Sequence, residues 1–346
     1  MCTRDRHRPE QNAATPRYGA ELSRGTADGN RRFLTAAKVS CFTRPRLGAF
    51  DYRWPVRPFG VQHPVRGNFG DPRTISAAGL GADDAGDRGV YSFHSGVDIS
   101  ASPGSPVYPV VSGFVQVRNT DEVIVHVPGG LRTFQYWHIR PRVRDGEWVI
   151  VDRTVLGVVK AIARHVHLTE IDGDKVTNPA QHLRPYQDTT PPTVQVVTIV
   201  NPAGRTLNPN AVAGVVSIVA EASDVPPLPV PGNWNGFPVT PARVSWTLSD
   251  AVGRSVLPAR VVVDFRRFEP RTRRFWSVYA AGTYQNFPVF DDHFYWRQAG
   301  RYLFKLTRRP LDTGRLPNGG YSLRVTASDI CGNRGTFSEP LRIAND

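Results

Sequence analysis

Short apolar runs broken by turn residues recur along the whole chain of 346 residues. Many are rich in Val, alternate with polar positions and end at Gly, Pro, Asn or Asp, a pattern typical of β-strands. No long stretch has the apolar period of an amphipathic helix. The pattern therefore predicts an all-β protein. Strands are expected at residues 107–117, 123–127, 132–139, 148–151, 194–200, 215–222, 243–248, 260–265, 302–306 and 321–328.

Segments rich in Gly, Pro and Asp divide these expected strands into two groups. Residues 1–53 are polar and basic, and are expected to be disordered or loosely attached. Residues 54–187 are expected to form one β-rich domain, in which residues 71–90 form a long loop because they are rich in Gly and Asp. The run Asp188-Thr-Thr-Pro-Pro-Thr193 predicts a stiff linker over 188–193. Strands spaced by turns over 194–346 predict a β-sandwich.

The chain is strongly basic, with a formal net charge of +13, which favours anionic partners such as nucleic acid or an anionic bacterial wall. No zinc-finger, helix-turn-helix or RNA-binding motif is present, so specific nucleic-acid recognition is not expected. No apolar run reaches the roughly 18 residues of a membrane span. No signal peptide is visible either, because the apolar run at residues 33–37 is too short and too polar.

The three cysteines give no sign of a shared role. Cys2, Cys41 and Cys331 lie far apart and have no CxxC spacing. They are expected to be small buried or incidental thiols, rather than a disulfide framework or a thiolate metal site.

Histidines and a carboxylate gather in the first group of strands with the spacing of a metal site. His94-Ser-Gly-Val-Asp98 is followed by a pair, His165 and His167, and His138 lies between them. Each motif is weak alone, because a single histidine is more often a satisfied polar group than a ligand. Their combination is stronger. A catalytic zinc ion takes three protein ligands and leaves a fourth position open, which His94, Asp98 and one histidine of the pair would supply.

Residues 63–183 resemble the lysostaphin-type zinc metallopeptidases, bacterial endopeptidases that cut peptides of peptidoglycan. The likeness rests on four runs in the family's order. They are His63-Pro-Val-Arg-Gly-Asn-Phe-Gly70, His94-Ser-Gly-Val-Asp98 with the Pro-Gly turn and Val-Tyr strand after it, Tyr136-Trp-His-Ile139, and His165-Val-His-Leu168. Residues 316–335 are similar to the closing strands of bacterial immunoglobulin-like modules.

The resemblance implies a small antiparallel β-sheet with a groove whose floor holds one Zn²⁺ per chain. It implies that His94, Asp98 and His167 bind the metal, and that His138 and His165 are unligated catalytic histidines. It also implies an immunoglobulin-like β-sandwich after the peptidase domain, and an extracellular or cell-envelope location.

The sequence departs from the family's pattern at two places. The segment from Leu156 to His165 is shorter than the family's loop and lacks its glycines, so a groove wall is expected to differ. The acidic residue after the HxH motif, Glu170, is displaced by one position and is expected to face the opposite side of the strand. Other titratable residues are expected to be exposed turn residues rather than ligands: Asp224, Asp264, Asp291, Asp292 and His293.

The expected function is hydrolysis of peptide bonds in bacterial peptidoglycan by a metal-activated water. No HExxH motif supplies a carboxylate base, so the imidazoles of His138 and His165 are the candidates for proton transfer or oxyanion stabilisation. The alternative is a catalytically weak or inactive peptidase-like domain that binds or activates at the cell wall. A basic nucleic-acid-binding protein is a further possibility, which the charge permits and no motif supports.

Overall fold

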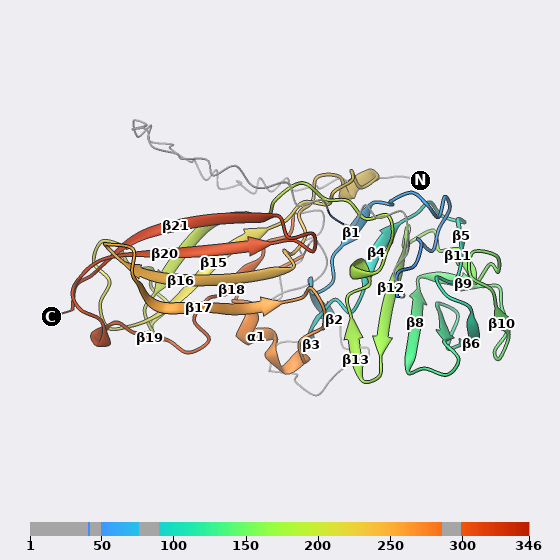
Figure 1. Cartoon of the computed structure of the whole chain (residues 1–346), viewed down its shortest axis with the longest axis horizontal. Coiled ribbons are helices and arrows are strands. Elements are labelled where there is room, and N and C mark those ends of the chain that lie inside the picture. Colours follow the sequence, from blue (N-terminus) through green and yellow to red (C-terminus); the bar gives the residue numbers. More distant parts are fainter. Residues whose placement is uncertain (1–40, 42–49, 76–89, 286–298, 346) are drawn as a thin grey trace, which may run out of the picture. The chain divides into compact units, whose positions relative to one another are not determined.

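β-strands dominate the part of the chain that the structure describes, as the alternating pattern predicts (Figure 1). The structure is a computed structural model that describes residue 41 and residues 50–75, 90–285 and 299–345. The one α-helix in these ranges, α1 (Phe275–Val278), has only 4 residues. Single-turn 3-10 helices are found at η2 (Pro179–Gln181), η3 (Gly232–Trp234), η4 (Thr272–Arg274) and η5 (Thr313–Arg315). The all-β prediction is therefore confirmed.

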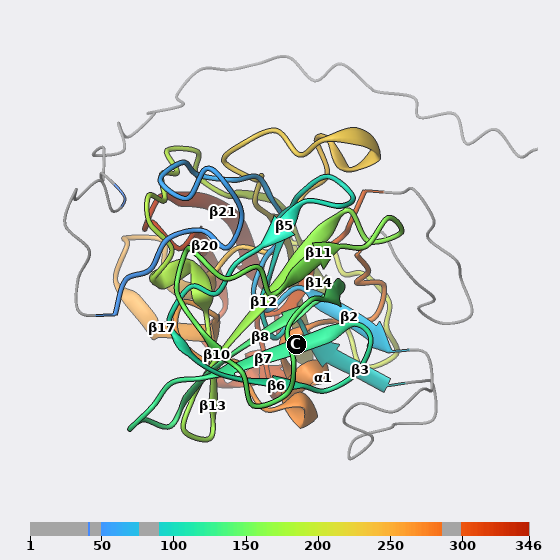
Figure 2. The same ribbon diagram turned by 90° about the vertical axis from the view of Figure 1, so that its right-hand side faces the viewer.

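The first group of strands builds one eight-stranded antiparallel sheet and a smaller one of three strands. In the larger sheet β12, β8, β7 and β6 lie side by side (Figure 2). Its spatial order is β1 (Val65–Gly67), β4 (Val97–Ser100), β12 (His165–Asp172), β8 (Arg132–Trp137), β7 (Glu122–His126), β6 (Gly113–Val117) and β10 (Trp148–Val149), with β13 (Lys175–Thr177) paired to β12. The smaller sheet has the order β5 (Pro106–Val107), β11 (Gly157–Val159) and β9 (Ile139–Pro141).

Strand β12 lies between β4 and β8, and its first six residues are all buried. Val166 and Leu168 are fully buried in the hydrophobic core. Because successive side chains of a strand point to opposite faces, His165 and His167 project away from that core. The alternation thus gives one strand an apolar face for packing and a polar face for chemistry.

The segment expected to form a long loop contains strand structure at both ends. β2 (Pro72–Ile75) pairs with β3 (Val90–Phe93) in an antiparallel ladder. The expectation of a continuous loop over residues 71–90 is therefore wrong at these ends, and residues 76–89 lie outside the described residues. β2 begins with Pro and Arg, so its sequence shows no alternation of apolar and polar residues that would predict a strand.

The second group of strands forms two four-stranded antiparallel sheets. Trp246 joins them, because its indole nitrogen donates to the carbonyl oxygen of Leu306 beside the opposite sheet, at 2.6 Å. One sheet has β14 (Thr193–Val200), β15 (Val215–Ser223) and β18 (Leu303–Lys305) in that order, with β19 (Leu311–Asp312) paired to β15. The other has the order β17 (Ser255–Asp264), β16 (Arg243–Asp250), β20 (Gly319–Ser328) and β21 (Arg334–Ile343).

Buried polar contacts connect the two groups of strands next to β2. Asp71 is fully buried, and its carboxylate accepts from the backbone N–H of Thr240 at 2.8 Å. The hydroxyl of Tyr279 donates to the carbonyl oxygen of Gly70 at 2.8 Å. The loop that leads into β2 is thereby held by residues from the second half of the chain.

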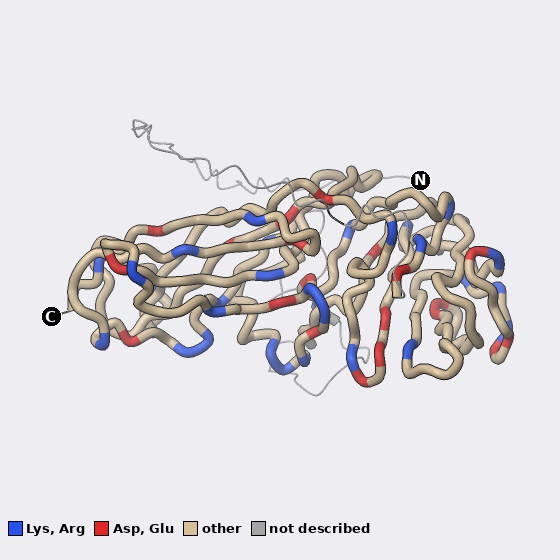
Figure 3. The backbone as a smooth tube through the Cα atoms, in the orientation of Figure 1, with Lys and Arg blue, Asp and Glu red and all other residues tan. Residues whose placement is uncertain are grey.

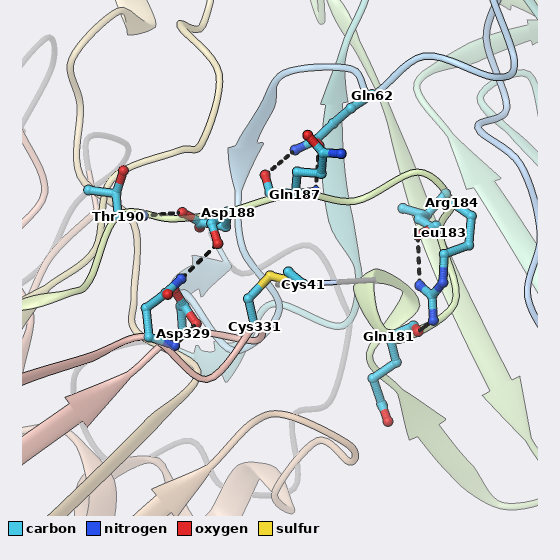
Figure 4. The surroundings of a disulfide bond; sticks show 11 residues. Cys41, Gln62, Gln181, Leu183, Arg184, Gln187, Asp188, Thr190, Asp329 and Cys331 are labelled. Carbon is cyan, nitrogen blue, oxygen red and sulfur yellow. Dashed lines mark hydrogen bonds between the residues drawn. A yellow bond between two sulfur atoms is a disulfide. The ribbon is translucent and has the colours of Figure 1, made fainter. Parts of the chain in front are cut away.

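Cys41 and Cys331 form a disulfide bond, although they are 290 residues apart (Figure 4). The expectation of incidental thiols is therefore wrong for these two residues. A pairing over this separation leaves no local spacing that a sequence could show. Disulfides persist in oxidising environments such as the cell exterior.

Tyr52 lies in the segment expected to be loosely attached. It is only 3% exposed, and its backbone pairs with that of Leu183 in an isolated β-bridge.

Lysine and arginine positions are scattered over the strands of both groups and the turns between them (Figure 3). Within the described ranges, no helix has the length and apolar character needed to cross a membrane.

Candidate metal centre

The pairing of β4 with β12 brings the HxxxD and HxH motifs together. In this antiparallel register Asp98 lies directly opposite His167, and Ser100 lies opposite His165. His94 directly follows the last residue of β3, and its side chain lies beside those of Asp98 and His167. Two segments about seventy residues apart thus meet because neighbouring strands align them.

Three potential ligand atoms converge at this point. His94 Nε2 lies 2.8 Å from His167 Nδ1 and 3.1 Å from Asp98 Oδ1. His167 Nδ1 lies 3.0 Å from the same carboxylate oxygen. The side chains are buried, with residue exposures of 4%, 7% and 8% for His94, Asp98 and His167. These three residues could hold a metal ion, because one ligand atom from each lies within 4.8 Å of the other two.

The hydrogen bonds on the outer sides of the two rings hold one nitrogen of each ring facing inward. His94 Nδ1 lies 2.8 Å from the carbonyl oxygen of Asn68, which can only accept, so Nδ1 carries the proton and Nε2 a lone pair. His167 Nε2 lies 2.7 Å from the hydroxyl of Thr169, which leaves Nδ1 facing His94 and Asp98. Such outer hydrogen bonds are typical of histidines that bind metals.

This donor set fits zinc. Two imidazole nitrogens and a carboxylate oxygen are zinc ligands, and tetrahedral bonds of 2.0–2.1 Å place ligand atoms about 3.3 Å apart. The three atoms of this site lie only slightly closer, at 2.8 to 3.1 Å. Three electron-pair donors that face one another are also an arrangement that a cation stabilises.

The two other histidines of the motifs lie beside these three. His165 Nε2 is 3.4 Å from Asp98 Oδ1, and its Nδ1 donates to the carbonyl oxygen of Ala163 at 2.7 Å. The His138 ring centre is 4.6 Å from that of His165. His138 has a positive φ of 66°, between β8 and β9, and its Nδ1 lies 3.5 Å from the Asp121 carboxylate. The structure thus brings all five site residues expected from the sequence into one cluster.

Two motif glycines allow backbone segments to approach this cluster closely. A Cβ atom on Gly96 would lie 2.2 Å from the carbonyl oxygen of Leu168 and 2.8 Å from His167 Nε2. A Cβ atom on Gly67 would lie 2.6 Å from the carboxylate of Asp98. Both distances are far below contact distance, so only glycine fits at these positions. The glycines of the first two motifs therefore have a packing role in building the site.

An arginine that the sequence did not single out completes the surroundings of Asp98. Arg73, from β2, donates to Asp98 Oδ2 at 3.1 Å and also donates to Gln285. Its position in a segment expected to be a loop gave no signal of this role. The contact leaves Asp98 Oδ1 as the carboxylate oxygen that faces the histidines.

The protonation states of the cluster suit metal binding. Burial, aided by the nearby Arg73 guanidinium, lowers the pKa of His94 to about 3. Burial alone would raise the pKa of Asp98, but the imidazoles of His94 and His165 hold it well below its usual range. Burial and the neighbouring His165 also lower the pKa of His138 to about 4. At neutral pH His94 is therefore neutral and Asp98 is ionised, the forms that ligands need, and His138 is neutral as well.

The carboxylate after the HxH motif faces away from the cluster, as its displaced position predicts. Glu170 accepts from the hydroxyl of Tyr52 at 2.7 Å and lies 2.8 Å from His182 Nδ1. Thr169 instead shares the face of His167 and contacts its ring. A hydroxyl, rather than a carboxylate, therefore lies beside the candidate ligand His167.

The segment before His165 forms a tight turn that approaches His138. It ends at Arg164, which has a positive φ of 56°. The ammonium group of Lys160 lies 2.8 Å from the same Asp121 that contacts His138. Ile162 is 94% exposed at the turn's tip.

A second group of acidic residues lies apart from the histidines. Asp188, Asp224 and Asp329 are each at least 96% buried, offer oxygens within 4.8 Å of one another, and line a cavity of about 20 Å³. Figure 4 shows Asp188 and Asp329 close to the disulfide. The expectation that Asp224 is exposed is therefore wrong. Asp264 is partly exposed and pairs with Arg266 at 2.6 Å, while residues 291–293 lie outside the described ranges.

Burial raises the pKa of all three buried carboxyls in this acidic group. For Asp188 the pKa rises to about 7, and the nearby Asp329 adds to the effect. The pKa of Asp224 rises well above its usual value, because Asp188 and Asp329 add to the effect of burial. These residues therefore hold protons at pH values at which exposed carboxyls are ionised.

The chain matches no protein-family model and no curated protein sequence. Solved structures are similar to part of it. The catalytic domain of the prophage-encoded M23 protein EnpA from Enterococcus faecalis is 23% identical, with 38% of this chain and 96% of that chain covered and a TM-score of 0.27. Csd3 from Helicobacter pylori is 20% identical, with 40% of this chain covered and a TM-score of 0.28, but only 36% of that chain is spanned. The catalytic domain of lysostaphin from Staphylococcus simulans is 18% identical, with 30% and 80% covered and a TM-score of 0.22.

Proposed function

We propose that this protein is a zinc-dependent endopeptidase that hydrolyses peptide bonds of bacterial peptidoglycan. The observation that carries the proposal is the convergence of His94 Nε2, Asp98 Oδ1 and His167 Nδ1 beside two further imidazoles. The choice of substrate rests on the resemblance of the four motifs to the lysostaphin-type peptidases. An extracellular or cell-envelope location agrees with this substrate and with the Cys41–Cys331 disulfide.

In this proposal His94, Asp98 and His167 hold one zinc ion. When bound, zinc polarises the scissile carbonyl and makes water acidic enough to serve as the nucleophile at neutral pH. Arg73 neutralises part of the negative charge on Asp98 and fixes the carboxylate. The outer hydrogen bonds to Asn68 and Thr169 fix the two ring orientations.

His165 is the proposed proton acceptor. Its Nδ1–H donates to the Ala163 carbonyl oxygen, so its unprotonated Nε2 faces the cluster. His138 is the second proposed catalytic residue, and its ring is held by the carboxylate of Asp121 on one side and by His165 on the other. With a pKa lowered to about 4, mainly by burial, His138 stays neutral at pH 7 and can hydrogen-bond to the substrate where charge develops.

Two substitutions separate metal binding from chemistry. His165→Ala is expected to abolish hydrolysis of purified peptidoglycan and to leave one zinc ion per chain. His94→Ala is expected to lose both. His126→Ala is the control, because His126 is exposed on β7 and its ring hydrogen-bonds to Gln116 instead of to a residue of the cluster. Zinc content measured by metal analysis and release of soluble wall fragments give the two readouts.

These two readouts distinguish the proposed endopeptidase from a catalytically inactive peptidase-like domain. Full hydrolytic activity in the His165→Ala protein would refute the assignment of the proton acceptor. Stoichiometric zinc in the unaltered protein, without hydrolysis of any wall preparation, would favour a catalytically inactive domain that binds the cell wall.

A further inference from the structure

We propose that a basic groove beside His165 binds a carboxylate group of the substrate peptide, so that acidic stem peptides bind better than neutral bridges. The groove has a volume of about 630 Å³. Its walls come from residues 56–66, from residues 100–108 with Arg164, and from residues 231–234 of the second group of strands. The inference rests on the proposed function, because it names the class of substrate for that site.

The groove begins at the edge of the metal centre. Arg164 and Ser100 line it, and they are respectively the chain neighbour and the cross-strand partner of His165. The carbonyl oxygen of Ala163 accepts from His165 Nδ1 at 2.7 Å and from Arg66 Nη1 at 3.2 Å. A ligand in the groove would therefore lie next to the proposed proton acceptor.

The groove lining is positively charged and contains no ion pair, and the Asp98 carboxylate attracts Arg66 only from beyond ion-pair distance. Its lining contains Arg57, Arg66 and Arg164, together with His63, and no Asp or Glu. Among the described residues, no carboxylate lies within ion-pair distance of these three arginines, whereas Arg73 pairs with Asp98 at 3.1 Å. Uncompensated guanidinium groups in a concave site attract an anion, and their planar fork matches a carboxylate.

Aromatic rings hold two of these guanidinium groups in place. Arg66 lies over the Trp234 ring, 4.2 Å from its centre. Arg57 lies 5.0 Å from the centre of the Tyr108 ring. Stacked guanidinium groups lose less side-chain freedom when a ligand binds, which favours affinity. Trp234 and Tyr108 also supply apolar walls against which a peptide can pack.

The size and chemistry of the groove favour one occupant. A volume of about 630 Å³ is within the usual range for small-ligand sites and can hold a few residues of a peptide. A glycine bridge carries no side-chain charge and would leave the arginines unpaired. An acidic stem peptide supplies the carboxylate that they lack.

Binding is tested with two soluble peptides and the zinc-loaded His165→Ala protein. One peptide is the tetrapeptide Ala–D-Glu–Lys–D-Ala with both amines acetylated, so that only its two carboxylates are charged, and the other is the same peptide with both carboxylates amidated. We expect the acidic peptide to bind at least about tenfold more tightly, as measured by calorimetry at constant ionic strength. Arg57→Gln and Arg164→Gln should each remove most of that difference. Arg324→Gln is the matched control, because it makes the same charge change on an exposed position of β20.

Two results would overturn the inference. They are equal affinity of the unaltered groove for the two peptides, or a loss of acidic-peptide binding in Arg324→Gln as large as the loss in Arg57→Gln and Arg164→Gln. Because binding is read directly, this test is independent of hydrolysis. An active enzyme with no preference for the acidic peptide refutes the groove, whereas arginine-dependent binding without wall hydrolysis in the unaltered protein refutes the proposed function.

Discussion

Substitution of Gly96 by alanine should separate the two strands that build the metal centre. The added methyl carbon would lie 2.2 Å from the carbonyl oxygen of Leu168, whereas a carbon–oxygen contact between strands needs about 3.3 Å. The backbone of β4 or β12 must therefore move by about 1 Å. Asp98 lies two residues after the substitution and His167 precedes Leu168, so the ligands would move with these strands. A metal site tolerates deviations of only about 0.2 Å in its metal–ligand distances.

We expect Gly96→Ala to weaken zinc binding at least about 10–100-fold, the range seen when support around metal ligands is lost. Overpacking should also lower the free energy of unfolding by about 1–3 kcal/mol. Zinc affinity is measured by competition with a fluorescent chelator, and stability by denaturant unfolding of the metal-free protein. Gly60→Ala is the control, because a Cβ at Gly60 would meet no atom within 4 Å. Zinc affinity equal to that of the unaltered protein would refute the reasoning.

Two other regions give predictions of their own. Because burial raises the pKa of Asp188 to about 7, this residue favours the folded state most at pH values below about 4, and that contribution is lost as pH rises through about 7. Asp188→Asn should therefore reduce the fall in melting temperature between pH 5 and pH 8, measured with a metal chelator present. An unchanged dependence of the melting temperature on pH would contradict this. Cys331→Ser removes the bond to Cys41 and should lower the free energy of unfolding by about 2–5 kcal/mol. Denaturant unfolding measures this free energy, and the unaltered protein in reductant should unfold like the variant. A Cys331→Ser protein as stable as the oxidised unaltered protein would count against the prediction.

Most strands could be predicted because their signal is local. The expected strand at residues 194–200 is β14, and the one at residues 321–328 lies within β20. The gathering of the candidate site residues was also predictable, because HxxxD and HxH place candidate ligands at fixed offsets that β4 and β12 then align. In these segments the alternation of side chains decides both the packing face and the face that carries the chemistry.

Other features depend on contacts between distant segments and left no local pattern. Arg73 pairs with Asp98 from a four-residue strand with little apolar alternation. Trp234 reaches the groove from a single-turn helix in the second half of the chain. The partner of Cys41 is 290 residues away. Such contacts form only when distant segments come together in the fold, so local sequence patterns cannot predict them.

The bond between Cys41 and Cys331 also closes a covalent ring around nearly all the described strands. A single proteolytic cut anywhere between the two cysteines opens this ring without releasing a fragment. A nicked molecule would therefore keep both strand groups tethered, and would migrate as one species on a denaturing gel until a reductant is added. In surroundings rich in proteases, this connectivity would let a cut chain retain the strands of its candidate metal centre.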